Sequence, residues 1–109
     1  MSREHKMRGS AQFRAVMGAG RRARTGTVVV YLAPTSGPVW RAGFVVSRVV
    51  GNSVERHRLT RRLRAIVAAE MTDSAIGWDI VVRALRPAGQ VSFQRLAQAV
   101  RWCLVKAAT

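Results

Sequence analysis

The segment from Asn52 to about Glu70 constrains the fold most, because its residue pattern suits only one kind of neighbour. At 100° per residue, its four large apolar side chains fall on an arc of roughly 100°, which is wide enough to pack on a sheet. These side chains are Leu59, Leu63, Ile66 and Val67. Asn52 precedes Glu55 by the spacing of a capping box, with Asn in place of the usual Ser or Thr. The sequence therefore predicts a helix that lies with one face on a β-sheet.

The opposite face of this helix is cationic. It carries His57, Arg58, Arg61, Arg62 and Arg64. Solvated helix faces normally mix charges of both signs, but here no acid occurs between Glu55 and Glu70, so the cations repel one another along the helix. Such a face lowers stability unless a polyanion neutralises it. The azimuth of Arg56 lies beside the apolar stripe, so this arginine is expected to project past the sheet edge.

The whole chain shares this bias, with 19 Lys+Arg against 5 Asp+Glu in 109 residues and a formal net charge of +14. RNA, DNA and an anionic membrane surface are the partners that such a charge favours. A membrane-binding helix would need bulky apolar anchors beside its arginines, whereas this helix needs its apolar residues for the core. Nucleic acid is therefore favoured. The hydrophobic content of 49% predicts one folded domain over residues 1–109.

Short β-branched and aromatic runs predict three strands, which cover residues 27–33, 40–47 and 78–84. Turn-forming residues from Pro34 to Pro38 separate the first two runs, so these two strands are expected to form a hairpin. Ser10 is expected to cap a first helix. Its apolar face would consist of Phe13, Val16 and Met17, and Gly18 and Gly20 would end it.

A last helix is expected to open at Ser92 and to pack on the sheet. Its apolar stripe would consist of Phe93, Leu96, Ala97, Val100, Cys103 and Leu104. Trp102 falls on the opposite side. An exposed tryptophan is most often incidental, but it can also stack on a base or contact a partner.

No arrangement of residues for catalysis is visible: the acids show no paired spacing, and His5 and His57 have no metal-ligand or triad partners nearby. Cys103 is the only cysteine, which excludes an intramolecular disulfide and suits a reducing compartment. It is expected to be a small buried apolar residue. The basic N-terminus, residues 1–8, precedes no apolar stretch long enough for a signal peptide or a membrane span. A soluble cytoplasmic protein without a membrane partner is expected.

A continuous pattern joins the second predicted strand to the cationic helix. Residues 43–48 read GFVVSR, and residues 50–64 read VGNSVERHRLTRRLR. This pattern resembles the signature of the bacterial ribonuclease P protein subunit, in which a Gly-Phe-x-Val-Ser strand and a Val-Gly-Asn turn precede a helix opening with Arg-Asn-Arg. Residues 8–16 and 79–87 resemble the first helix and a later strand of that family. The resemblance covers most of the chain.

The resemblance implies an α+β fold, an α/β sandwich with three helices and a small mixed sheet of about four strands, one more than the runs above supply. It also implies a split βαβ unit with a left-handed crossover, as in the ribosomal protein S5 domain 2-like fold, which general topology rules would not predict.

The implied activity is that of an endoribonuclease, a hydrolase that works as a ribonucleoprotein. The protein would bind the ribonuclease P catalytic RNA and the 5′ leader of precursor tRNA, and would assist removal of the leader. The catalytic centre is expected in the RNA subunit, with Mg²⁺ bound mainly by RNA. This chain would supply no catalytic residue and no metal ligand, and would be a monomer within the holoenzyme.

Carried over position by position, the resemblance implies RNA contacts along the cationic helix and its approach. These are Arg48, Asn52, Arg56, His57, Arg58, Arg61, Arg62 and Arg64. It also implies a cleft for the single-stranded leader, where aromatic faces stack on bases without demanding a sequence. The cleft residues are Phe13, Met17 and Tyr31. Three positions depart from the family pattern: His57 stands for Asn, Met17 for a second aromatic, and Val49 for a Lys that could contact phosphate.

Three alternatives stay open at the level of the sequence. A different RNA binder of similar size, such as a ribosomal or assembly protein, would bind RNA without affecting leader removal. A self-sufficient nuclease would need convergent acids or metal ligands. A protein of the membrane surface would bind anionic vesicles.

Overall fold

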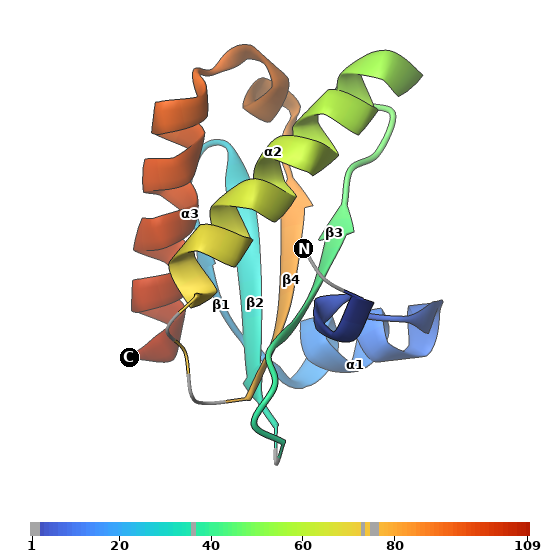
Figure 1. Cartoon of the computed structure of the whole chain (residues 1–109). Helices are drawn as coiled ribbons and strands as arrows, with labels where there is room; N and C mark the ends of the chain where they lie inside the picture. The colour runs from blue at the N-terminus through green and yellow to red at the C-terminus, as the bar shows by residue number, and fades with distance from the viewer. Residues whose placement is uncertain (1–2, 36, 73, 75–76) are drawn as a thin grey trace.

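The computed structural model describes residues 3–35, 37–72, 74 and 77–109, and its helices and strands are shown in Figure 1. The helices are α1 (Gly9–Ala19), α2 (Ser53–Met71) and α3 (Phe93–Ala108), and the strands are β1 (Arg21–Arg24), β2 (Val28–Pro34), β3 (Arg41–Val45) and β4 (Trp78–Ala84). Two short 3₁₀ helices, η1 (Arg3–His5) and η2 (Arg86–Gln90), complete the set. The expected α+β class, with three α-helices and a four-stranded sheet, is confirmed.

The four strands form one mixed sheet in the order β1-β2-β4-β3. β1 and β4 both run antiparallel to β2, whereas β3 runs parallel to β4. The predicted hairpin between residues 27–33 and 40–47 is therefore wrong, because β4 lies between these strands. Ile80, Val81 and Val82 of β4 are all fully buried, so both faces of this strand are covered. Burial on both faces is typical of a strand in the middle of a sheet. The real hairpin joins β1, which the sequence runs missed, to β2.

The connection from β3 through α2 to β4 is a left-handed crossover. In Figure 1 both strands point upward, α2 lies in front of the sheet, and β4 lies to the left of β3. Right-handed crossovers are the general rule for parallel strands. The unusual hand that the family resemblance implied is thus present.

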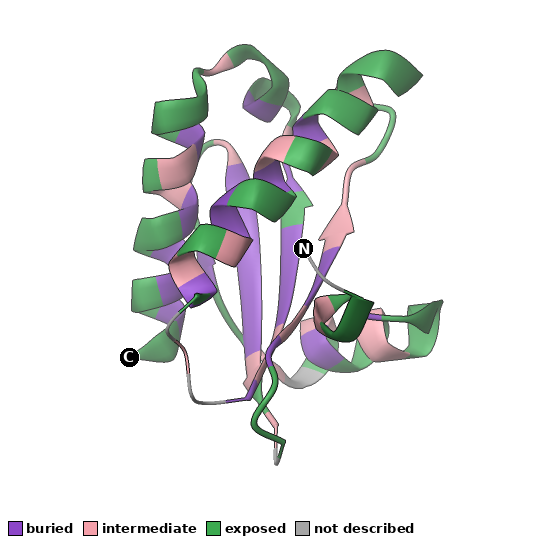
Figure 2. Cartoon of the chain, in the orientation of Figure 1, coloured by how far each residue is buried: buried purple, intermediate pink, exposed green. Residues whose placement is uncertain are grey.

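The two faces of the sheet bury two separate clusters. Figure 2 shows that buried residues are concentrated in the central strands and on the sides of α2 and α3 that face them. α2 and α3 cover the larger cluster, to which the sheet contributes Val28, Val30, Leu32, Ile80 and Val82. α1 covers part of the other face, where Met7, Val16, Val29, Tyr31 and Val81 form the smaller one. Alternation of side chains along β2 and β4 separates the two sets.

The predicted start and inner face of α2 are confirmed. The side-chain oxygen of Asn52 accepts a hydrogen bond from the Glu55 backbone N–H at 2.9 Å, and Glu55 Oε1 accepts one from the Asn52 backbone N–H at 2.9 Å. This is the capping box that the sequence indicated. The four predicted core residues of the helix are buried, and Met71 joins them.

Both of the other helices differ in detail from their predictions. α1 begins at Gly9 with Arg8 as its N-cap, so Ser10 lies inside the helix and does not cap it. Ser92 does cap α3, because its Oγ accepts a hydrogen bond from the Arg95 backbone N–H at 3.1 Å. Phe93, which the helical period predicts to lie in the buried stripe, is 44% exposed. The stripe is instead completed by Ala107 at the other end of the helix.

Candidate nucleic-acid interface

The outer side of α2 forms a cationic concavity of about 220 Å³. It is lined by Ser53, Arg56, His57, Thr60, Arg61 and Arg64. The helical period brings these six residues to one flank, because they repeat at intervals of three and four. Three guanidinium groups and one imidazole therefore share a single hollow, which we call the α2 groove.

Arg56 belongs to this groove, although its azimuth suggested a place beside the apolar stripe. Its Nη1 donates a hydrogen bond to the backbone carbonyl of Gly51 at 2.9 Å, and the residue is only partly exposed. The Thr60 hydroxyl donates to the Arg56 carbonyl at 2.8 Å. The bond to Gly51 holds the Arg56 side chain across the first turn of the helix and leaves its other N–H donors available.

The structure does not bring every predicted contact into the groove. Arg58 and Arg62 lie on the other flank of α2, with Arg58 exposed and Arg62 partly buried. Arg48 is exposed in the loop that leads to the helix. The side-chain oxygen of Asn52 is already used by the cap of α2, so its first role is structural. Val49, at the position where the family has a Lys, is 55% exposed.

A second hollow, of about 150 Å³, continues from the α2 groove toward the N-terminal segment. Thr60 and Arg64 line both hollows, and the second one also contains Lys6 and Phe13. No local pattern in the sequence singles out Lys6. Its place depends on contacts with β3, where a β-bridge joins it to Ala42.

His5 fixes the N-terminal segment beside this hollow. Its ring stacks on Trp40 with a centroid distance of 3.8 Å and an interplanar angle of 8°, and its Nδ1 lies 2.7 Å from the Trp40 carbonyl oxygen. The backbone N–H of Met7 donates to the Ala42 carbonyl at 3.0 Å. These three contacts set the direction in which the chain enters α1.

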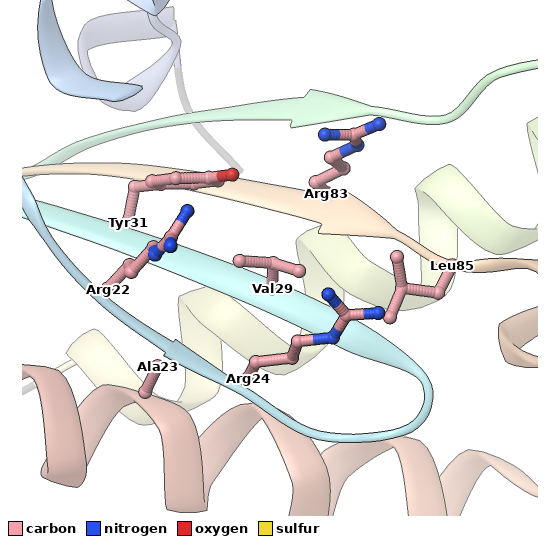
Figure 3. A pocket seen from close by; sticks show the side chains of 7 residues that line it. All are labelled: Arg22, Ala23, Arg24, Val29, Tyr31, Arg83 and Leu85. Carbon is pink, nitrogen blue, oxygen red and sulfur yellow. The ribbon is translucent and has the colours of Figure 1, made fainter. Parts of the chain in front are cut away.

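A third and larger hollow, of about 420 Å³, opens on the face of the sheet that α1 covers only in part. We call it the sheet cleft, and Figure 3 shows its side chains. They are Arg22, Ala23, Arg24, Val29, Tyr31, Arg83 and Leu85. Tyr31 is the predicted leader residue among them. The sequence alone does not indicate the three arginines. The register of β1 and β2 brings two of them to the cleft, because Arg22 pairs with Tyr31 and Arg24 pairs with Val29.

The three residues that the resemblance assigns to a leader cleft lie together, but not in one hollow. Phe13 and Met17 of α1 are partly buried and pack against the cluster that contains Tyr31. Phe13 lines the hollow beside Lys6, whereas Tyr31 lines the sheet cleft. Met17 lines neither. The grouping is therefore a continuous aromatic and apolar seam beneath α1.

The carboxylates that the structure describes are all occupied by near neighbours. Glu4 lies beside His5, Glu55 closes the α2 cap, Glu70 pairs with Arg101, and Asp79 pairs with Arg41. Within residues 3–35, 37–72, 74 and 77–109, no three His, Cys, Asp or Glu side chains gather as a ligand set. Mg²⁺ prefers carboxylate and water oxygens. The described donors therefore do not fit a Mg²⁺ site built by this chain alone.

Cys103 is fully buried in the larger core, as expected. Burial raises the pKa of its thiol from 9.0 to about 11. The thiolate, which is the reactive form, is thus disfavoured at neutral pH. In the part of the chain that the structure describes, no helix is both long and apolar enough to span a bilayer.

These features define a class: a small, strongly basic α+β sandwich that presents a cationic groove on a sheet-packed helix and an arginine-lined cleft on the other face of the sheet. The model of the ribonuclease P family matches residues 1–108, and the chain belongs to this family. Its role is therefore that of the protein subunit of ribonuclease P in the processing of tRNA 5′ ends.

Relatives and solved structures agree with this membership. The ribonuclease P protein component of Kocuria rhizophila is 41% identical over 97 residues, covering 89% of this chain and 86% of the relative. That of Acidothermus cellulolyticus is 46% identical over 95 residues, covering 85% and 79%. The RNase P protein of Staphylococcus aureus has the same fold, with a TM-score of 0.85, 23% identity and 94% of each chain covered. That of Thermotoga maritima has a TM-score of 0.78, 23% identity, and 88% and 91% covered.

Proposed function

We propose that the α2 groove binds the RNA subunit of ribonuclease P and that the sheet cleft binds the 5′ leader of precursor tRNA. The observation that carries this proposal is the convergence of Arg56, Arg61 and Arg64 in one hollow that none of the described carboxylates lines. Planar guanidinium groups suit phosphate oxygens, which they can hold through two N–H donors at once. The groove therefore fits the backbone of a folded RNA.

The sheet cleft suits a single strand. Tyr31 lines the cleft with an aromatic ring that is 6% exposed, and Arg22, Arg24 and Arg83 surround the cleft with positive charge (Figure 3). Single-stranded nucleic acid is typically bound by a cationic channel that contains aromatic side chains for base stacking. Phe13 and Met17 extend the seam beneath α1. Binding in the cleft would screen phosphate repulsion, so a precursor would bind more tightly than mature tRNA.

The chemical step is assigned to the RNA subunit. The described carboxylates are engaged in caps and ion pairs, which supports a positioning role for this chain. Mg²⁺ ions would be bound mainly by RNA phosphates. We further propose that the protein acts in the cytoplasm, whose reducing conditions suit its single, buried cysteine. We also propose that one copy of the protein is present in the holoenzyme as a monomer.

Reconstitution tests the function as a whole. Added to the cognate RNA subunit and precursor tRNA at low Mg²⁺ concentration, the protein should restore removal of the 5′ leader. RNA binding without stimulation would instead favour a ribosomal or assembly protein. Cleavage by the protein alone would favour a self-sufficient nuclease, and sedimentation with anionic vesicles would favour a membrane-surface role.

Single substitutions test the two surfaces separately, with Arg21→Ala as the matched control. Arg21 and Arg22 are neighbours on β1, but only Arg22 lines the sheet cleft. Arg22→Ala should weaken binding of precursor more than binding of mature tRNA, whereas Arg21→Ala should change the two equally.

Arg61→Ala should weaken binding of the RNA subunit. Each lost phosphate contact should change the salt dependence, log Kd against log salt, by about 0.7 to 0.9. A slope equal to that of Arg21→Ala would exclude the α2 groove as the RNA contact.

A further inference from the structure

A fourth hollow, which neither proposed RNA surface uses, lies between the outer side of α3 and the turn that joins β1 to β2. Its volume is about 460 Å³. Arg95, Gln98 and Trp102 of α3 line one wall, and residues Thr25–Thr27 line the other. Trp102 is 52% exposed, so a large part of its indole is open to a ligand.

The α3 wall is cationic as well as aromatic. Arg95, Gln98 and Trp102 follow one another at helical spacing on the side of α3 away from the buried stripe, and Lys106 lies one turn beyond Trp102, outside the lining of the hollow. α3 contains no Asp or Glu. Among the described residues, the side chains of Arg95 and Lys106 take part in no ion pair or hydrogen bond. Their charges are therefore available to an anionic ligand that also offers a flat apolar face for Trp102.

The turn wall is held in place by its own hydrogen bonds. Thr25 Oγ1 accepts from the backbone N–H groups of Thr27 and Val28, each at 3.3 Å. The Thr25 N–H donates to the Val28 carbonyl at 2.9 Å. A hollow with a fixed wall costs less entropy to fill than one that must form on binding.

This turn also separates the hollow from the sheet cleft. Arg24 lines the cleft, and Thr25, the next residue, lines the hollow. On the far side of the turn, Leu85 lines the cleft and donates its N–H to the Thr27 carbonyl at 2.8 Å. A single-stranded RNA that leaves the cleft past Arg24 would therefore enter the hollow that contains Trp102 after it passes the β1–β2 turn.

We infer that this hollow binds an unpaired base in the part of the precursor leader that extends beyond the sheet cleft. The base stacks on Trp102, while Arg95 and Lys106 neutralise adjacent phosphates. This inference rests on the proposal that the cleft holds the leader. It adds a subsite that only precursors with long leaders can fill.

The test uses holoenzyme reconstituted with the cognate RNA subunit and measures Kd for mature tRNA and for two precursors, with leaders of about 4 and about 12 nucleotides. Trp102→Ala should weaken binding of the long-leader precursor about fivefold, the low end expected for a half-exposed stacking residue, and leave the short-leader precursor unchanged. Trp102→Phe keeps an aromatic face and should weaken binding of the long-leader precursor less than Trp102→Ala does. Val105→Ala is the matched control, because Val105 is exposed on the same helix but does not line the hollow.

Arg95→Ala should lower the salt slope by about 0.7, again only for the long leader. Equal effects of Trp102→Ala on both precursors, or no effect on either, would overturn the subsite. A wild-type holoenzyme that binds the short-leader precursor no better than mature tRNA would instead overturn the leader-binding proposal itself. Thermal unfolding of each variant verifies that the fold is intact.

Discussion

Gly43→Ala should test how closely α1 is fitted to the sheet. A methyl group built on Gly43 would lie 2.3 Å from Phe13 Cζ and 2.5 Å from Cε2. Ordinary contact begins near 3.4 Å, so the ring would have to retreat by about 1 Å. Because Phe13 is one of the apolar residues through which α1 packs against the smaller cluster, this movement should loosen the helix.

The expected loss of stability is about 1–3 kcal/mol, the usual range for an added methyl group in a packed site. Urea denaturation should show it as a lower midpoint with an unchanged slope. For a chain of this size, 1 kcal/mol corresponds to a fall in Tm of about 4–8 °C.

The same substitution in a Phe13→Ala background isolates the cause. With the ring removed, Gly43→Ala should become neutral or stabilise the protein by about 0.4–1 kcal/mol, because alanine restricts the unfolded chain more than glycine does. The two substitutions should therefore be coupled in a double-mutant cycle. An equal loss with and without the Phe13 ring would refute the argument, and would place the strain in the strand itself.

Three further predictions concern stability. Asn52→Ala should cost about 1 kcal/mol in urea denaturation by removing the α2 cap, whereas Asn52→Asp should retain most of it; equal midpoints for Ala and wild type would contradict the capping role. Arg41→Lys should lower the free energy of unfolding in urea by about 1 kcal/mol. Arg41 donates two hydrogen bonds of 3.0 Å to the Asp79 carboxylate, and an ammonium group cannot form this two-pronged contact. Arg41→Met should lower the free energy of unfolding further, because methionine donates no hydrogen bond to the carboxylate. The raised pKa of Cys103 predicts that stability is unaffected below pH 9 and falls between pH 9 and 11, since the unfolded thiol ionises first. At pH 10 the loss should be about 1.4 kcal/mol, and Cys103→Ala should lack this dependence.

Local patterns in the sequence predicted the elements well where local physics decides them. The start of α2 depends on Asn52 and Glu55, which are three residues apart, and the capping box formed as expected. The strand at Trp78–Ala84 and the helix start at Ser92 are also confirmed. In each case, one short pattern contains all the necessary information.

Strand pairing was wrong because it is decided at long range. Residues 34–38 have the composition of a hairpin turn, yet β3 pairs with β4, some forty residues further along the chain. The apolar centre of β4 needs neighbours on both edges, and this demand outweighs the turn signal. β1 was missed for a related reason: its RRAR sequence lacks β-branched residues, and it is a strand only because β2 offers it a partner.

The candidate site could likewise be predicted where local spacing determines it and not where strand register does. The cationic face of α2 follows from helical spacing, so most of its residues could be predicted, although only the structure shows that Arg56 joins Arg61 and Arg64 while Arg58 and Arg62 stay apart. Tyr31 came from the family resemblance. Arg22, Arg24 and Arg83 came from neither, since they converge only through the register of three strands.

That register also explains why the sheet cleft stays open. α1 is 11 residues long and covers only part of its face of the sheet, and Val29 lines the part that stays open. The cross-strand neighbours of Val29 are Arg24 and Arg83, and Val29 is nevertheless only 6% exposed. Long arginine side chains can cover an apolar residue with their methylene groups while the charged ends remain in water. The same side chains therefore cover this part of the core and line the cleft.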